Sequence, residues 1–251
     1  MNKPIVALVP MRHHSERVPG KNYRPFAGRP LYHRIVETLL TCPMVAEVVI
    51  DTDSAFIMDD ATKHFPQVRI LERPDHLKAG TVPMNDVLLY DAAQIESDFY
   101  IQTHSTNPLL KSETISKAIG RFFDNRSRFD SLFSVTRIQS RLWDHLTRAI
   151  NHDPAVLLRT QDLPPCYEEN SCLYIFSRHT LENRHNRIGR RPLMFEIDPM
   201  EAWDIDEEWD FRIAEFLYIE REGETDDNSP LEGTYYSPLY AACGGSFPSS
   251  L

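Results

Sequence analysis

Short apolar runs alternate along this chain with stretches of helical periodicity, and that alternation restricts its fold more than any other feature. Residues 5–9 (IVALV) form a β-branched apolar run that ends at Pro10, which predicts a strand buried on both faces. Residues 31–40 then carry apolar side chains at helical spacing. The same signals predict further strands at 48–50, 68–71, 99–101 and 131–135, and further helices at 54–65, 83–95 and 112–123, the last with Ser112 as its N-cap.

Repeated strand–helix–strand units predict an α/β protein with a mainly parallel sheet and helices on both faces, in a Rossmann-like three-layer αβα arrangement. Ligands of such folds bind outside the carboxyl ends of the strands. The loops after residues 9, 50 and 101 fall at these ends. We therefore expect the functional site where these three loops come together.

The alternation stops between residues 137 and 191. This part has few helix signals, a Pro164-Pro165 break and one short apolar strand at 173–176, so we interpret it as an insertion or lobe. The segment is too irregular to build its own core, and its exposed apolar residues then predict a homodimer. These residues are Leu142, Trp143, Tyr174 and Phe176.

The chain is expected to close with a helix and a tail. The helix is predicted at about 207–221, and the apolar residues on one of its faces are Trp209, Ile213, Phe216 and Leu217. After Gly223 the sequence is rich in Gly, Ser, Pro and Tyr without periodicity, which predicts disorder. The predicted organisation is one domain at 1–223, with its lobe at about 137–191, and a tail at 224–251.

Charge and composition exclude several classes of protein. The net charge is −10 and the basic residues do not gather in blocks, so neither nucleic acid nor an anionic membrane is an expected partner. The sequence has no apolar run long enough to cross a bilayer, and no signal-peptide pattern follows Met1. Its four cysteines show no CxxC spacing, so we expect reduced thiols and a cytoplasmic protein.

The loop after the first strand carries several cations. Arg12, Arg17, Lys21 and Arg24 fall within it, together with a Pro-Gly turn. Cations at the end of a buried strand make a site for a polyanion, and the commonest small polyanion is a nucleoside triphosphate. Neither GxxxxGK[ST] nor GxGxxG is present. By spacing alone, a solvated basic turn is an equally good interpretation.

Four features of this region form a signature: Arg12, Ser15, the stretch 17–22 (RVPGKN) and the stretch 28–31 (GRPL). They resemble the N-terminal signature of the acylneuraminate cytidylyltransferase family, whose members make CMP-activated ulosonic acids such as CMP-sialic acid. The Pro-Gly-Lys part is similar to that of the CMP-Kdo synthetases. One departure is Glu16, since sialate synthetases usually carry a second lysine before the proline.

Later stretches extend the same resemblance in the same order. They are Arg73-Pro74 with Leu77, Gln102 with 106–109 (TNPL), 133–137 (FSVTR) with Trp143, 158–162 (LRTQD), 167–170 (YEEN) before Tyr174, and 203–206 (WDID). Two positions depart from the family pattern. Gly80 stands where many relatives have an acidic residue, and Gln102 lies two residues further from Pro108 than is usual.

The resemblance implies a nucleotidyltransferase fold with a small dimerisation lobe that closes over the sugar in a homodimer. It implies that a ulosonic acid attacks the α-phosphorus of CTP through its anomeric hydroxyl, with Mg²⁺ as cofactor. The implied nucleotide-binding residues are Arg12, Ser15, Arg17, Lys21, Asn22 and Arg73. The implied sugar-acid-binding residues are Gln102, Thr106, Asn107, Arg159, Gln161, Glu169 and Asn170. The implied Mg²⁺ ligands are Asp204 and Asp206, which join Arg12 and Lys21 as catalytic residues.

Several of these residues also have a purely structural explanation. Asp204 and Asp206 precede a helix, where acidic residues are favoured as caps and by the helix dipole. The other structural explanations are a turn for Glu169 and Asn170, hydrogen-bonded structure for Gln102 and a surface ion pair for Arg159.

Two other classes of function stay open. One is a non-catalytic nucleotide-binding or regulatory relative, in which Glu16 and Gly80 mark lost activity. The other is a metal-dependent phosphohydrolase, for which the sequence offers no nucleophilic or water-positioning motif. His13 and His104 fall near the expected site by topology but lack metal-ligand spacing.

Overall fold

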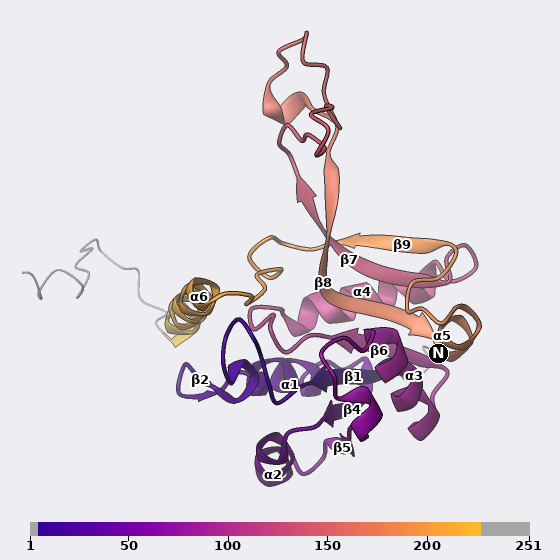
Figure 1. Ribbon diagram of the computed structural model, residues 1–251, viewed down its shortest axis with the longest axis vertical. Helices are drawn as coiled ribbons and strands as arrows, with labels where there is room; N and C mark the ends of the chain where they lie inside the picture. The colour runs from indigo at the N-terminus through magenta and orange to yellow at the C-terminus, as the bar shows by residue number, and fades with distance from the viewer. Residues whose placement is uncertain (1–4, 227–251) are drawn as a thin grey trace, which may run out of the picture.

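A computed structural model describes residues 5–226, in which helices flank a central sheet (Figure 1). The strands of the sheet are β1 Ile5–Met11, β4 Val45–Thr52, β5 Arg69–Glu72, β6 Phe99–Thr103, β7 Ser131–Ile138, β8 Cys166–Ser177 and β9 Pro192–Glu196. A separate hairpin pairs β2 Pro25–Phe26 with β3 Arg29–Pro30. The helices are α1 Tyr32–Leu40, α2 Ala55–His64, α3 Met84–Gln94, α4 Ser112–Asp124, α5 Arg178–Arg184 and α6 Glu208–Asp226, with 3₁₀ turns at Lys21–Tyr23, Asp75–Leu77 and Thr160–Asp162.

The sheet is mainly parallel, as predicted. Its strand order is β5-β4-β1-β6-β8-β7-β9. β1 pairs in parallel with β4 and β6, β4 with β5, and β7 with β9, whereas β8 is antiparallel to both β6 and β7. The carboxyl ends of β1, β4 and β6 therefore lie at one edge, where the sequence placed the site.

Two boundary predictions need correction. β1 does not end at Pro10 but continues to Met11, with Pro10 opposite Asp51 of β4. Pairing between β1 and β6 stops at Leu8, so the missing N–H of the proline falls where β1 has a partner on one side only. Ser112 is the first residue of α4, and Lys111 stands at the cap position.

The two faces of the sheet bury separate cores. Alternate residues of a strand point to opposite faces, so Ala7 and Val9 of β1 join α1 and α4 on one side. Val6 and Leu8 join α3 and α5 on the other side. Each fully buried aliphatic side chain contributes about 2 kcal/mol through its removal from water. This burial on both faces establishes the three-layer αβα architecture.

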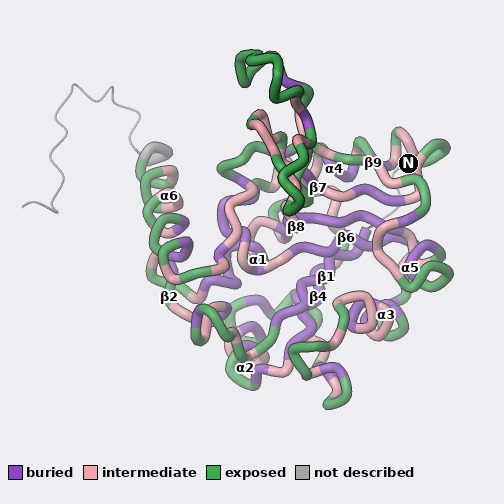
Figure 2. The backbone as a smooth tube through the Cα atoms, turned by 45° about the horizontal axis from the view of Figure 1, so that its top comes forward, coloured by how far each residue is buried: buried purple, intermediate pink, exposed green. Residues whose placement is uncertain are grey.

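Residues 139–165 form an arm that projects from the sheet between β7 and β8 (Figure 1). The arm is largely exposed (Figure 2), including the large apolar residues Trp143, Leu146, Ile150, Val156, Leu157 and Leu158. Tyr174 and Phe176, which the sequence assigned to the lobe, are instead fully buried in β8, because β8 pairs with β6 inside the main sheet.

The last helix, α6, packs on the first loop through a third core cluster. Phe211 and Ala214 are buried there against Val18, Phe26 and Leu31. The other face, with Trp209, Ile213 and Phe216, is exposed. Within the described residues, no helix combines the length and apolar character needed to cross a membrane. The predicted disorder of the tail concerns residues that lie, from 227 onward, outside the described part of the chain.

Candidate functional site

The loops that follow β1 and β6 enclose a polar cavity of about 310 Å³ at the carboxyl ends of these strands. Several of the residues that line it were expected from the sequence to bind the nucleotide. The lining residues are Pro10, Met11, Arg12, His14, Ser15, Glu16, Arg17, Lys21, Asn22, Gly80, His104, Ser105 and Thr106. The cavity thus lies at the predicted edge of the sheet and gathers three of the four predicted cations, whereas Arg24 pairs with Glu208 at 2.5 Å.

Asn22 and Ser15 give the first loop its shape. The Asn22 side-chain amide donates to the Arg12 carbonyl at 2.8 Å, and its Oδ1 accepts from the Ser105 hydroxyl at 2.7 Å. Ser15 Oγ accepts from the Val18 N–H at 3.4 Å. Gly20 takes a left-handed backbone conformation (φ 68°), and a Cβ atom there would lie 2.9 Å from the Tyr23 ring. The loop is therefore a built structure, held to the loop after β6.

Arg12 presents its guanidinium to the cavity, which the Glu16 carboxylate also lines. Arg12 is exposed and forms no ion pair with any residue of the described chain. Its guanidinium lies against Gly80, where an added Cβ would come within 2.8 Å of Nη1. The absence of a side chain at position 80 is therefore what makes room for the guanidinium.

Lys21 joins the first loop to the segment before α6. Its ammonium group donates to the Ile205 carbonyl and lies 3.9 Å from the Asp206 carboxylate. Burial lowers the pKa of Lys21, while the charges of Asp204 and Asp206 act in the opposite direction. The two carboxylates thus help to keep a half-buried ammonium group charged at the edge of the cavity.

The segment 203–206 is fixed to the loop after β6. The Ile205 N–H donates to the Thr106 carbonyl at 3.0 Å, and the Asn107 amide donates to the Trp203 carbonyl at 3.3 Å. Burial raises the pKa of Asp204, although a hydrogen bond from Thr106 opposes the shift. Asp204 Oδ1 is buried and has no hydrogen-bond partner in the described structure.

The cap explanation does not describe what Asp206 does. The carboxylate that satisfies the start of α6 belongs to Asp210, whose Oδ2 accepts from the N–H groups of Asp206 and Glu207 at 3.0 and 2.7 Å. Asp206 Oδ1 instead accepts from Arg17 Nη2 at 2.5 Å. Its carboxylate is therefore directed toward the cation loop.

Asp204 and Asp206 fit a hard cation. Carboxylate oxygens are the ligands Mg²⁺ prefers, and the buried, unpartnered Oδ1 of Asp204 is an oxygen for which a cation would be the natural partner.

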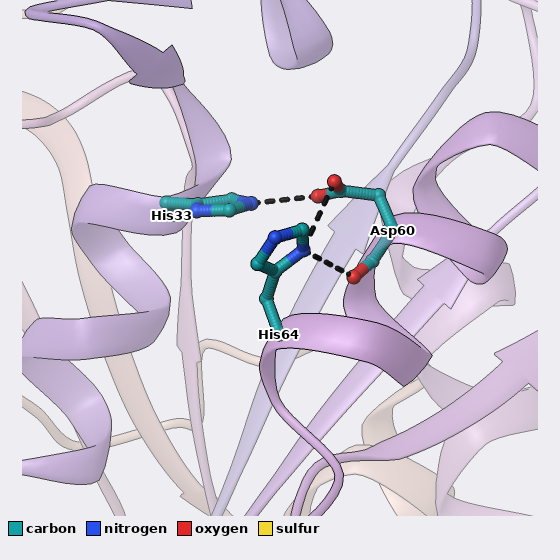
Figure 3. A group of neighbouring side chains, drawn as sticks. All are labelled: His33, Asp60 and His64. Atoms are coloured by element: carbon teal, nitrogen blue, oxygen red, sulfur yellow. Dashed lines mark hydrogen bonds and ion pairs between the residues drawn. The ribbon is translucent and has the colours of Figure 1, made fainter.

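The described residues contain one group of three metal-ligand candidates elsewhere, His33, Asp60 and His64, which contact one another between α1 and α2 (Figure 3). Its imidazole nitrogens suit transition metals better than Mg²⁺.

Arg73, expected to bind the nucleotide, is not brought to the cavity. Its side chain is 2% exposed, and its Nε donates to Asp51 at 2.5 Å. Asp91 lies beside this pair, and burial together with the Asp51 charge raises the pKa of Asp91 to about 9. Arg73 therefore belongs to a buried ionic cluster behind strands β4 and β5.

The residues expected to bind the sugar acid are divided between three places. Thr106 lines the cavity, and the buried Asn107 supports the segment behind it. Arg159 pairs with Asp162 on the exposed arm, and the exposed Gln161 lies beside it. Arg159 thus forms the surface ion pair that the sequence offered as its alternative.

The Asn170 side chain is hydrogen-bonded to hydroxyl groups of the neighbouring strand β7. Its Oδ1 accepts from the Ser134 hydroxyl at 2.6 Å and its amide donates to Thr136 at 2.9 Å. These contacts bridge the irregularity in the β7–β8 pairing between Phe133 and Val135. Asn170 therefore has a structural role in strand pairing, whereas the sequence had suggested a turn.

Gln102 contacts Arg187, a residue that sequence reasoning missed, and Glu169 lies near it through Tyr174. Gln102 is fully buried, and its Oε1 accepts from Arg187 Nη1 at 2.5 Å. Glu169 accepts from the Tyr174 hydroxyl at 2.5 Å, and the Arg187 guanidinium lies 3.5 Å from the centre of the same tyrosine ring. Arg187 stands 85 positions from Gln102 in a stretch with no recognised motif, so no sequence signal pointed to it.

His104 was placed near the site by topology and does line the cavity. Burial and the nearby charges of Arg187 and Lys21 lower its pKa to about 4. Its ring is therefore neutral at pH 7, and its Nε2 has no hydrogen-bond partner within the described residues. A neutral imidazole at this position can accept or donate one hydrogen bond to a ligand.

The three-layer fold is that of the nucleotidyltransferases, and cations of its first loop line a polar cavity beside the Asp206 carboxylate. A family model described as Cytidylyltransferase matches residues 6–225, and the chain belongs to that family. The family assignment and the fold class predicted from the motifs are both confirmed.

Several relatives resemble the chain over most of its length. Post-translational flagellin modification protein B of Campylobacter coli is 27% identical over 228 residues, covering 86% of this chain and 96% of the relative. Pseudaminic acid cytidylyltransferase of Campylobacter jejuni is 26% identical over 227 residues, covering 85% and 95%. A solved structure of CMP:2-keto-3-deoxy-manno-octonic acid synthetase complexed with CTP has a TM-score of 0.66 at 17% identity, covering 87% and 99%, a likeness of fold.

Proposed function

We propose that this protein transfers CMP from CTP to the anomeric hydroxyl of a 2-keto-3-deoxy sugar acid and releases pyrophosphate. The observation that carries the proposal is a polar cavity lined by Arg12, Arg17 and Lys21, with the Asp206 carboxylate beside it in contact with Arg17 and Lys21. Family membership supports it, as do relatives named pseudaminic acid cytidylyltransferase and, from Oncorhynchus mykiss, N-acylneuraminate cytidylyltransferase.

The chemistry assigns work to the cations. The sugar hydroxyl oxygen bonds to the α-phosphorus, the bond to the pyrophosphate oxygen breaks, and the hydroxyl proton is lost to a base. Negative charge is redistributed over the α-phosphate and the leaving oxygens, so fixed cations accelerate the step. Arg12 forms no ion pair in the described structure, and Lys21 is held in place by the Ile205 carbonyl. These two residues would hold the triphosphate.

We propose Mg²⁺ as the cofactor, held by Asp204 and Asp206. When bound, the ion would neutralise phosphate charge and orient the phosphate oxygens. The buried free oxygen of Asp204 supports this assignment. Because Arg17 already holds one oxygen of Asp206, Arg17 would also fix how that carboxylate faces the cavity.

The homodimer expected from the sequence is part of the proposal. The arm exposes apolar side chains, including Leu157 at 87%, that a partner would cover. Arg159 and Gln161 lie on this arm and do not line the cavity of their own chain, so a role in sugar binding would require a second copy. Light scattering at micromolar concentration tests the assembly, and a monomer would contradict it.

We also propose a cytoplasmic location. Cys42, Cys166 and Cys172 are free thiols in the described structure, and Cys42 and Cys172 are buried. Unpaired cysteines are typical of a reducing compartment.

One assay tests the proposed reaction against its alternatives. The protein is incubated with CTP, Mg²⁺ and a panel of pseudaminic, legionaminic, N-acylneuraminic and 3-deoxy-manno-octulosonic acids, and pyrophosphate is followed. Release that depends on the sugar acid is expected. Release without any sugar acid would indicate a hydrolase, and CTP binding without release would indicate a non-catalytic relative. Comparable turnover with UTP, GTP or ATP would contradict the choice of CTP.

A further inference from the structure

Arg187 is held in one orientation by buried partners. Its guanidinium stacks on the Tyr174 ring, 3.5 Å from the centroid, and Nη1 donates to Gln102 Oε1 at 2.5 Å. Both partners are fully buried strand residues, on β8 and β6. The loop that carries Arg187 is anchored as well, because its own N–H donates to Asn85 Oδ1 at 3.1 Å. A cation with so little freedom is pre-organised for a ligand.

The charge of Arg187 is not balanced within the described chain. Its fixed partners are a neutral amide and a phenol, and it forms no ion pair with a described carboxylate. Glu169 is near enough to influence its charge, but the Glu169 carboxylate accepts its hydrogen bond from the Tyr174 hydroxyl. Burial lowers the pKa of Arg187, because removing the guanidinium from water disfavours its charged form. A partly buried cation without a counter-ion is best satisfied by an anion from outside the chain.

The position of Arg187 relates this cation to the cavity. Gln102, its hydrogen-bond partner, stands near the carboxyl end of β6, two residues before the cavity-lining His104. The charge of Arg187 also acts on His104. Arg187 is itself neither fully buried nor a lining residue of the cavity. The cation therefore stands beside the cavity, on the β8 side, away from the triphosphate cations of the first loop.

We propose that Arg187 binds the carboxylate of the acceptor substrate, in a subsite formed with Gln102 and Tyr174. A guanidinium matches a carboxylate through two parallel N–H groups, and one N–H to Gln102 leaves others available. In a 2-keto sugar acid the carboxylate is attached to the anomeric carbon, so a fixed carboxylate also places the attacking hydroxyl. The inference rests on the proposed function and adds that the acid is recognised by the chain that carries the cavity.

The test compares an acid with its neutral derivative. The acceptor is whichever panel acid the wild-type enzyme uses best, offered as the free acid and as its carboxyl methyl ester. We expect wild type to prefer the acid on the order of a hundredfold in kcat/KM, the scale of one desolvated charge pair. In Arg187→Met the preference should fall to roughly threefold or less, because the variant lacks the cation that distinguishes the acid from its ester. Arg187→Lys, which keeps the charge and loses the fork, should fall between them.

Two further variants, the CTP dissociation constant and Tm separate the proposed subsite from other causes of a lost acid preference. Arg190→Met removes an exposed arginine of the same loop and should keep the wild-type preference. Arg159→Met tests the competing assignment, in which the arm of a second copy holds the acid. The CTP dissociation constant and Tm show whether Arg187→Met folds, and Arg187→Lys replaces it if it does not.

The outcomes are separable. A collapsed acid preference with unchanged CTP affinity supports the subsite. An undiminished preference in Arg187→Met or Arg187→Lys, or its loss in Arg159→Met alone, overturns it. If wild type uses no acid of the panel, the proposed function itself fails, and the inference with it.

Discussion

The guanidinium of Arg17 donates to Asp206 Oδ1 at 2.5 Å, although 189 positions separate the two residues. The contact joins the loop after β1 to the segment that precedes α6. Both side chains are about half exposed, 56% and 45%, so the pair adds at most about 1 kcal/mol to stability. Its consequence is positional, because it turns the Asp206 carboxylate toward the cavity and away from the helix terminus.

Replacement of Asp206 by Asn should therefore remove activity without affecting the fold. Asn keeps the shape and one carbonyl oxygen but loses the charge that would hold Mg²⁺. We expect a loss of at least about a hundredfold in kcat and a higher Mg²⁺ requirement, with Tm nearly unchanged. Steady-state kinetics across a Mg²⁺ titration measures both. Normal activity at low Mg²⁺ would refute the metal assignment.

Asp210 supplies the matched control for a cap. Its Oδ2 accepts from two backbone N–H groups at the start of α6. Asp210→Ala should cost about 1 kcal/mol in the free energy of unfolding, as removal of a cap does, and reduce activity far less than Asp206→Asn. Denaturant unfolding of the two variants side by side separates the roles. A larger stability loss in Asp206→Asn would restore the cap explanation.

Arg12 and Lys21 are expected to act on catalysis as fixed cations. Arg12→Ala or Lys21→Ala should lower kcat/KM for CTP on the order of a hundredfold, the effect of removing one preorganised electrostatic group. Arg29→Ala is the control, since Arg29 lies outside the cavity and pairs with Glu37 at 2.7 Å. Wild-type kinetics in both cavity variants would make the loop a solvated turn after all.

Much of this site could be predicted from local sequence, because its residues stand at strand ends. An apolar run, a turn and clustered cations place Arg12 and Lys21 at the carboxyl end of β1 without knowledge of any other element. A parallel sheet then brings the end of β6 and Thr106 to the same edge. The motif around Asp204 adds the neighbouring segment, where Lys21 meets the Ile205 carbonyl and Asp206.

The remainder depends on contacts that local sequence does not encode. Arg73 directly follows strand β5, at a position from which a residue can reach a nucleotide. Its side chain instead donates a hydrogen bond to Asp51 on the neighbouring strand. Arg187 meets Gln102 only because β8 inserts antiparallel beside β6, and that crossover has no periodicity signal. Tyr174 was assigned to the lobe for the same reason.

The ionisation of Asp204 predicts a dependence of stability on pH. Burial raises the pKa of Asp204, so this carboxyl ionises at higher pH in the folded chain than in the unfolded one. Its contribution to stability therefore falls as pH rises from its unfolded pKa through its folded pKa. Asp204→Asn should then raise the free energy of unfolding at pH 7, and by less at pH 4, while abolishing activity. Urea unfolding without Mg²⁺ at both pH values tests this, and destabilisation at pH 7 would contradict it.

Gly80 provides the most selective test of the Arg12 geometry. A Cβ at this position would lie 2.8 Å from Arg12 Nη1, so Gly80→Ala should displace the guanidinium and lower kcat/KM for CTP by roughly tenfold. The backbone at 80 is not in the left-handed region, so the substitution should leave Tm within about 2 °C. If the effect acts through Arg12, Gly80→Ala should cost almost nothing further in an Arg12→Ala background. Additive losses in that double variant would show that position 80 acts on the substrate by another route.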